Sequence, residues 1–168
     1  TYSIIVKGTP TATAGGSQNI CQGGTAVVSG ASSANGTILW TENGLGSITA
    51  GATTLTPTYT SAAGDAGTTV TLTMTVSNAP CADATAVYSV VVKATPTASA
   101  GGSATICQTG TYTLVGGEAT STNGTILWTE NGAGTITAGS TGLTPTYTAA
   151  AGEPGNTVTL TMTVSNAP

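Results

Sequence analysis

The sequence predicts an all-β protein made of two tandem β-sandwich domains. Two observations carry this prediction: most of the chain is repeated, and apolar residues alternate with threonine inside each copy. The stretch "TVTLTMTVSNAP" stands at 69–80 and again at 157–168. Because side chains of a strand point to opposite faces in turn, this alternation predicts a strand with one apolar and one hydroxyl-bearing face.

The repeat is long enough to be a domain. "TPTATAGGSQNIC" at 9–21 returns as "TPTASAGGSATIC" at 95–107, so Cys21 and Cys107 lie 86 residues apart. From "NGTILWTENG" onward the offset is 88 residues, as between Trp40 and Trp128. A unit of about 87 residues can bury a core of its own, unlike the shorter rung of a solenoid.

The ends of the chain fall inside the repeat. The N-terminal "TYSIIVKGTP" matches "VYSVVVKATP" at 87–96. We therefore expect residues 1–8 to be the last strand of a preceding repeat, 9–94 to be a complete repeat, and 95–168 to be a repeat without its final strand. Such a chain is either a window on a longer tandem array or one whose two ends meet across molecules, as donated strands do.

Further strands are predicted in the complete repeat by short β-branched runs between Gly, Asn and Pro turns. Asn35-Gly36 and Asn43-Gly44 flank one of these runs and predict two hairpin turns, since Asn-Gly suits the positive φ angles of type I′ turns. No segment predicts a helix. In chain order the expected strands are 25–29, 37–41, 47–50, 54–60, 69–77 and 87–93.

About seven strands per repeat, with a tryptophan near the third, are typical of an immunoglobulin-like sandwich. The junctions at 7–11 and 93–97 are short and contain Pro10 and Pro96, so neighbouring domains are expected end to end with little swivel. The predicted core consists of Trp40, Trp128, Val70, Leu72, Met74, Val76, Leu160 and Met162.

Composition excludes several functions. The chain has two Lys and Arg residues in total and a net charge of −4, so it lacks the cations that neutralise nucleic-acid phosphates. No run of 18 apolar residues predicts insertion into a membrane. Only 5% of residues are charged, so the hydroxyl groups of threonine are expected to solvate the surface.

The sequence also argues against an enzyme. It contains no histidine, which removes the usual general base and the commonest metal ligand. We expect no catalytic, cofactor or metal site, because the carboxylates are scattered. Asp65, in a "GDAG" turn, is interpreted as a turn residue and not as a calcium ligand. The acidic residues are Glu42, Asp65, Asp83, Glu118, Glu130 and Glu153.

Cysteines are the remaining candidates for chemistry. Cys21 and Cys107 precede strands and Cys81 follows one, a spacing that predicts disulfides in a secreted array. One pairing joins Cys21 to Cys81 inside a domain and closes a loop of about 60 residues. By the loss of chain entropy in the unfolded state, this disulfide would stabilise the domain by about 4 kcal/mol. The other joins Cys21 to a cysteine expected after Pro168, which would staple neighbouring domains. In both cases Cys107 needs a partner beyond these residues, and Cys81 does too in the second.

The motifs "ICQGG", "NGTILWTENG", "LTPTYT", "VTLTMTVSNAPC" and "VYSVVVK" together resemble the PKD-like or immunoglobulin-like repeats of large surface adhesins of Bacteroidota. The resemblance spans the whole chain and includes the gliding adhesins exported by type IX secretion. It implies secretion, a cell-surface location, gliding motility as a context, and an extended stalk.

These observations predict a structural spacer that holds a distal binding region away from the cell. Its expected partners are neighbouring copies of the same repeat, with surface glycans bound by a distal region outside this sequence. Two alternatives are a filament subunit joined by strand donation and a carbohydrate-binding module. The second is less favoured because most tyrosines fall at inward-facing positions.

Overall fold

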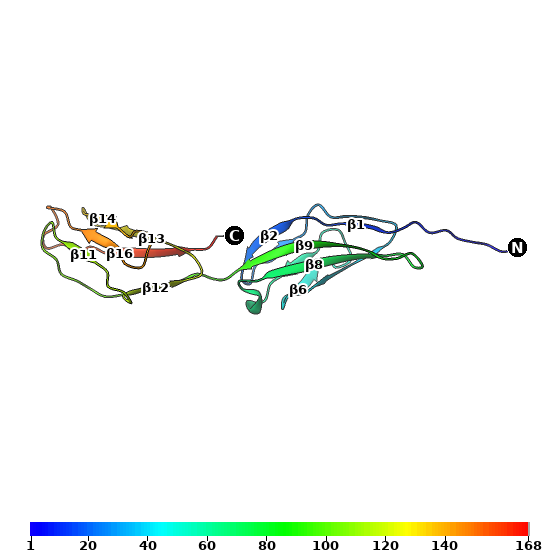
Figure 1. The fold of residues 1–168 in the computed structure, drawn as a ribbon, viewed down its shortest axis with the longest axis horizontal. Coiled ribbons are helices and arrows are strands. Elements are labelled where there is room, and N and C mark those ends of the chain that lie inside the picture. The colour runs from blue at the N-terminus through cyan, green and yellow to red at the C-terminus, as the bar shows by residue number, and fades with distance from the viewer. Residues whose placement is uncertain (168) are drawn as a thin grey trace. The chain divides into compact units, whose positions relative to one another are not determined.

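The computed structural model describes residues 1–167 and is all-β, with one short 3₁₀ turn and no α-helix in that range (Figure 1). The chain divides into two compact units, Thr1–Ala94 (unit 1) and Thr95–Ala167 (unit 2). No helix within residues 1–167 has the length and apolarity needed to cross a bilayer.

Unit 1 contains nine strands in three small sheets. A four-stranded sheet has the order β2-β9-β8-β5, a three-stranded sheet has the order β3-β7-β6, and β1 pairs with β4. All ladders are antiparallel except β2 with β9, which is parallel. The strands are β1 (Thr11–Thr13), β2 (Ser17–Cys21), β3 (Thr25–Val27), β4 (Ser32–Ala34), β5 (Thr37–Glu42), β6 (Ser47–Ala50), β7 (Thr58–Thr60), β8 (Thr69–Ser77) and β9 (Ala84–Lys93).

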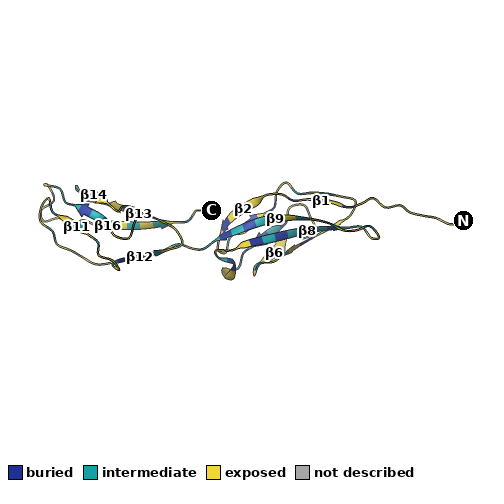
Figure 2. Ribbon diagram, in the orientation of Figure 1, coloured by how far each residue is buried: buried dark blue, intermediate teal, exposed yellow. Residues whose placement is uncertain are grey.

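The predicted alternation on β8 is confirmed. Val70, Leu72, Met74 and Val76 are at most 2% exposed, while the threonines between them reach the other face (Figure 2). Residues from the four-stranded and the three-stranded sheets share one continuous core, which includes Trp40. The unit therefore buries its apolar faces without help from residues of unit 2.

The two predicted Asn-Gly hairpins are wrong. Gly36 connects β4 to β5, and Gly44 connects β5 to β6, but in both cases the linked strands lie in different sheets. Asn35 does adopt a positive φ of 57°, and its side chain donates to the carbonyl of Thr9. Asn43, Gly36 and Gly44 do not share this positive φ, so neither site is a type I′ turn, and both carry the chain from one sheet to another.

Residues 1–8 pair with no described strand. The apolar side chains of this segment lie in solvent, with Tyr2 92% and Val6 89% exposed. Only its last residues are held: Lys7 Nζ donates to the carbonyl of Ala79, and the Asn78 side chain donates to the carbonyl of Gly8.

Unit 2 repeats most of these elements. Its sheets are β11-β15-β14, β13-β16 and β10-β12. Within residues 1–167, β16 has a ladder partner on one side only. The strands are β10 (Thr97–Ala100), β11 (Thr111–Thr113), β12 (Ala119–Thr122), β13 (Thr125–Glu130), β14 (Thr135–Ala138), β15 (Thr146–Thr148) and β16 (Leu160–Ser165).

The core prediction holds in part in unit 2. Trp128 is 3% exposed, as Trp40 is in unit 1. Leu160 and Met162, predicted as core residues, are only half-buried, although their counterparts Leu72 and Met74 are 0% exposed. The two strands have the same local sequence, so the difference comes from what packs beside them.

This contrast gives a matched pair of substitutions. We expect Leu72→Ala to lower the free energy of unfolding of unit 1 by about 2–5 kcal/mol, as truncation of a fully buried leucine does. Leu160→Ala should cost unit 2 less, because Leu160 is only half-buried and already keeps part of its surface in water. Each unit has one tryptophan, so urea unfolding can be followed by the fluorescence of Trp40 in Trp128→Phe and of Trp128 in Trp40→Phe. Equal losses would contradict this interpretation.

Candidate binding groove in unit 2

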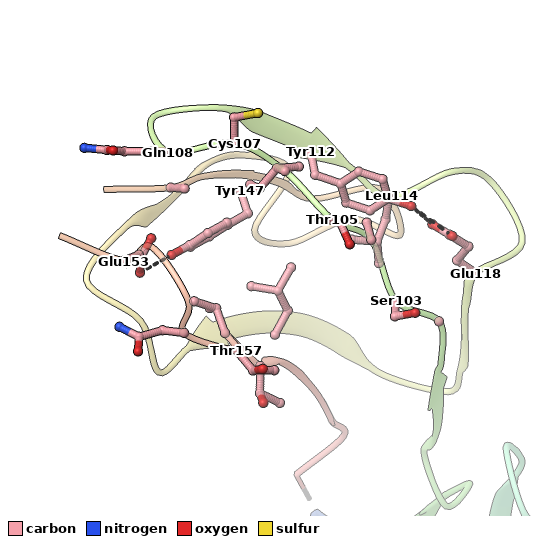
Figure 3. A pocket seen from close by; sticks show the side chains of 18 of the residues that line it. Ser103, Thr105, Cys107, Gln108, Tyr112, Leu114, Glu118, Tyr147, Glu153 and Thr157 are labelled. Atoms are coloured by element: carbon pink, nitrogen blue, oxygen red, sulfur yellow. Dashed lines mark hydrogen bonds between the residues drawn. The ribbon is translucent and has the colours of Figure 1, made fainter. Parts of the chain in front are cut away.

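A groove of about 720 Å³ opens beside β16 in unit 2 (Figure 3). Two long runs of residues, 100–108 and 153–160, form its walls, and Trp128 and Tyr147 also line it. Residues 103–107 form no strand, although their counterparts in unit 1 form β2. The lining is mainly backbone, small polar side chains and apolar side chains, with no histidine or basic residue.

The corresponding space in unit 1 is filled by β9. That strand lies between β2 and β8, and these are the counterparts of the two groove walls. Tyr88, Val90 and Val92 of β9 point into the core and are 6%, 0% and 0% exposed. The groove of unit 2 is thus a place where the fold of unit 1 puts a strand.

One end of the groove is closed by a buried tyrosine–carboxylate pair. Tyr147 donates its hydroxyl hydrogen to Glu153 Oε1 at 2.6 Å, and Glu153 is 7% exposed. The same carboxylate accepts backbone N–H bonds from Ala133, Gly134 and Ala150. A Cβ at Gly134 would collide with the Tyr147 hydroxyl, so only glycine lets the chain approach this closely.

Unit 1 has the same arrangement. Tyr59 donates to Asp65 Oδ2 at 2.6 Å, and Asp65 also accepts from the backbone N–H groups of Leu45, Gly46 and Ala62. Asp65 lies on the 3₁₀ turn Ala63–Asp65 and is 2% exposed. It is therefore a turn residue, as predicted, but a buried one that ties the turn to the loop before β6.

These contacts shift the pKa of each group in both pairs. The pKa of Glu153 falls to about 2, first because of the Tyr147 hydrogen bond and then because of the backbone donors, which outweigh burial. For Asp65, burial acts to raise the pKa, but the combined hydrogen bonds from Leu45 and its other donors lower it. Burial, followed by the Asp65 hydrogen bond, raises the pKa of Tyr59 to about 12. Both carboxylates are thus held ionised.

A second pair is present in unit 2 alone. The Tyr112 hydroxyl donates to Glu118 at 3.0 Å, and Glu118 also accepts from the backbone N–H of Val115. The Glu118 hydrogen bond raises the pKa of Tyr112. The aligned positions in unit 1 are Ala26 and Gly30, so the two units differ at this edge of the groove.

The sequence pattern alone did not lead us to predict the tyrosine–carboxylate pairs. A signal was available: Tyr59 and Asp65 are six residues apart, and Tyr147 and Glu153 repeat that spacing. Asp65 and Glu153 differ by one methylene group, yet both place a carboxylate where it accepts the hydrogen of the tyrosine hydroxyl. By contrast, Glu42 and Glu130 lie at strand ends and are half-buried.

The three cysteines are free thiols in this structure. Cys21 lies opposite Lys93 at the end of β9, whereas Cys81 precedes the start of β9. A ten-residue strand is about 33 Å long, far beyond the reach of a disulfide, so the Cys21–Cys81 pairing inside a domain is not formed. Cys107 lines the groove. The pairing with a cysteine after Pro168 falls outside the described residues.

Among residues 1–167, no three His, Cys, Asp or Glu side chains gather in a way that could hold a metal ion. The buried carboxylates are already saturated by hydrogen bonds from the protein. What the groove offers is backbone that forms no ladder along residues 103–107 and 157–159, with apolar side chains between the two walls.

Comparisons with known proteins do not assign this chain to a family. No family model matches the chain, and no curated protein matches it. One solved structure that matches is a nucleoside hydrolase-related hypothetical protein from Saccharophagus degradans, associated with carbohydrate metabolism. The identity is 16% and the TM-score is 0.34, with 53% of this chain and 26% of that chain covered. A likeness this weak supports no conclusion about fold or function.

The lowered pKa of Glu153 predicts acid sensitivity in unit 2. Because the folded-state pKa is about 2 and the ordinary value is 4.5, the stabilisation is complete above about pH 4.5 and is lost as the pH falls toward 2. We expect the Tm of unit 2, followed by Trp128 fluorescence in Trp40→Phe, to fall across this window.

Glu153→Gln is the control for that prediction. It should lower the Tm of unit 2 at pH 7, because an amide accepts these hydrogen bonds less strongly, and should flatten the dependence on pH between 4.5 and 2. If this variant kept the slope of the unsubstituted chain, another carboxylate would be responsible.

Proposed function

We propose that this chain is part of a structural stalk, in which each unit is an immunoglobulin-like sandwich that acts as a spacer. In this proposal the stalk belongs to a long, secreted surface adhesin of the kind that the sequence resembles, and it carries a distal binding region away from the cell. The observation that carries the proposal is the self-contained core of unit 1, which draws every member from residues 12–92.

A self-contained core suits a spacer because length can then be extended by repetition alone. Each added unit brings its own sheets and needs no new partner surface. The near-identical strand sequences of the two units fit this role, since a spacer has no pressure to diversify its faces. The alternation of apolar residues with threonine keeps the outer faces polar with few charges.

The immunoglobulin-like topology belongs to the same proposal. Its support is the order of the elements: a tryptophan strand, β5, paired with the long β8, and a final strand, β9, inserted between β8 and the parallel edge strand β2. Short strands of both sheets close over one core. Unit 2 shares the pairing of its tryptophan strand, β13, with β16, and a matching three-stranded sheet, β11-β15-β14.

The tryptophans argue against a sugar-binding surface. Both indoles are buried, and each donates its N–H to a backbone carbonyl, Trp40 to Thr54 and Trp128 to Gly142, at 2.8 Å. A sugar-binding platform presents aromatic faces to solvent, and these two do not. Tyr59, Tyr88 and Tyr147 are also buried.

The spacer proposal predicts that length grows with copy number. Chains carrying two, four and six copies of residues 9–94 should gain about 30–40 Å in maximum dimension per copy, the length of a ten-residue strand plus turns. Small-angle X-ray scattering measures this dimension. Growth with the cube root of mass, as for a compact particle, would contradict the proposal.

A glycan array probed with the same chains is the companion experiment. A pure spacer should give no signal above a Trp-free β-sandwich control. Specific binding to one class of glycan would replace the spacer role with the carbohydrate-binding alternative.

A further inference from the structure

We propose that the groove of unit 2 is the acceptor site for a single extended strand, and that residues 1–7 of a second copy of this chain fill it. Copies would then join head to tail, each supplying the strand that completes the sheet of the next. The inference deepens the proposed stalk function by naming a partner, and it rests on that function only for its biological purpose.

The molecule contains its own comparison for the acceptor. Residues 69–77 and 157–165 have the same sequence, yet the first segment is β throughout and the second is β only from Leu160. Val70, Leu72 and Val76 are fully buried, while Val158, Leu160 and Val164 are half-buried. The two environments differ because β8 has β9 as its neighbour in the sheet, paired with it along eight residue pairs. A strand in the groove would give residues 157–159 the ladder partner that their counterparts have.

The wall opposite β16 shows the same effect. Residues 17–21 form β2 because they pair with β9 in a parallel ladder. Residues 103–107, their counterparts, line the groove without strand structure. One inserted strand would therefore order both walls at once, since each wall differs from its counterpart by the same missing neighbour.

The donor is the N-terminal segment. "TYSIIVK" at 1–7 matches "VYSVVVK" at 87–93, the part of β9 that contacts both β2 and β8. Its side chains are free to bind: Tyr2, Ile4 and Val6 are 92%, 76% and 89% exposed. It has no place in unit 1, because β9 already occupies the matching position there.

The register follows from the repeat. By analogy with β9, Ile4 would lie between Ala104 on one wall and Val158 on the other, parallel to the first and antiparallel to the second. Tyr2, Ile4 and Val6 would then point into the core, as Tyr88, Val90 and Val92 do, and Ser3 and Ile5 would point away. Main-chain hydrogen bonds would supply much of the affinity, and the three inward pockets would supply selectivity.

The same register predicts where the cysteines of the two copies would lie. By the same register Cys107 of the acceptor would lie opposite Lys7 of the donor, as Cys21 lies opposite Lys93. In the donor itself, Cys81 Sγ is 3.7 Å from the carbonyl oxygen of Lys7. Cys107 of one copy and Cys81 of the next would thus flank the same residue.

The first experiment compares two variants of the full chain, Ile4→Asp and Ile5→Asp, by analytical ultracentrifugation over a wide concentration range. We expect the unsubstituted chain to form oligomers that grow with concentration. Ile4→Asp should weaken association about a hundredfold or more, because its charge would enter the core unpaired. Ile5→Asp, with the same composition, should stay within about threefold of the unsubstituted chain.

Both substitutions lie in an exposed segment outside the cores, so both variants should fold, and Trp40 and Trp128 fluorescence verifies this. A chain that stays monomeric at all concentrations would overturn the proposal. So would equal weakening by the two variants, or concentration-independent closure of the segment onto its own chain.

A self-complemented chain gives an independent test. Residues 81–94 are appended after Pro168, where the repeat places them, so that each copy fills its own groove. We expect this chain to remain monomeric and the amides of residues 157–159 to gain protection from hydrogen exchange. Assembly as strong as that of the original chain would overturn the proposal, because the groove would then not be the site.

Crosslinking tests the register. A chain with Cys107 as its only cysteine is mixed with one that has Cys81 alone, and a short bismaleimide adds one thiol at each end without any redox step. We expect a crosslinked heterodimer in this mixture. The heterodimer should be lost when the chain with Cys81 carries Ile4→Asp and should remain when it carries Ile5→Asp. Association without this crosslink would overturn the register.

Spacer length and strand donation are measured separately, so either proposal can fail while the other stands.

Discussion

The packing of β9 against β8 is the interaction on which the rest of unit 1 depends. The two strands are antiparallel neighbours in one sheet over most of their length, and their alternate apolar residues point into one core. β9 also orders β2 through a parallel ladder at its other edge. A single strand therefore completes the four-stranded sheet, buries β8 and recruits the segment that contains Cys21. In unit 2 the matching strand β16 has no described strand in the position of β9, and its apolar residues are only half-buried.

The tyrosine–carboxylate pairs contribute a second, local constraint. In each unit a buried carboxylate gathers the hydroxyl group of a tyrosine on one sheet and the backbone N–H groups of two loops. Because these acceptors are ionised and fully bonded inside a largely apolar region, they fix the loops at the end of each unit more firmly than turn residues in solvent would. This is a low-cost device for a chain with few charges, since one carboxylate holds several backbone donors.

An open sheet edge is usually a liability, because exposed backbone groups attract other strands. Here the edge of β16 and the exposed apolar segment at residues 1–7 have complementary patterns, and such complementarity makes pairing selective instead of general. The small share of charged residues gives the rest of the surface little electrostatic protection against association. Selectivity would then depend on the match between three inward side chains and the groove that receives them.

Sequence alone determined the features set by local pattern. The period of two placed β8 and β9 and their inward faces, and Trp40 was correctly assigned to a core strand. The tertiary structure decided the rest. It turned the Asn-Gly sites into crossings between sheets and buried Asp65 with its four donors. It also left Leu160 only half-buried, although Leu72, within the same twelve letters, is fully buried. The physical reason is that alternation fixes which way a side chain points, whereas burial depends on neighbours supplied by residues distant in the chain.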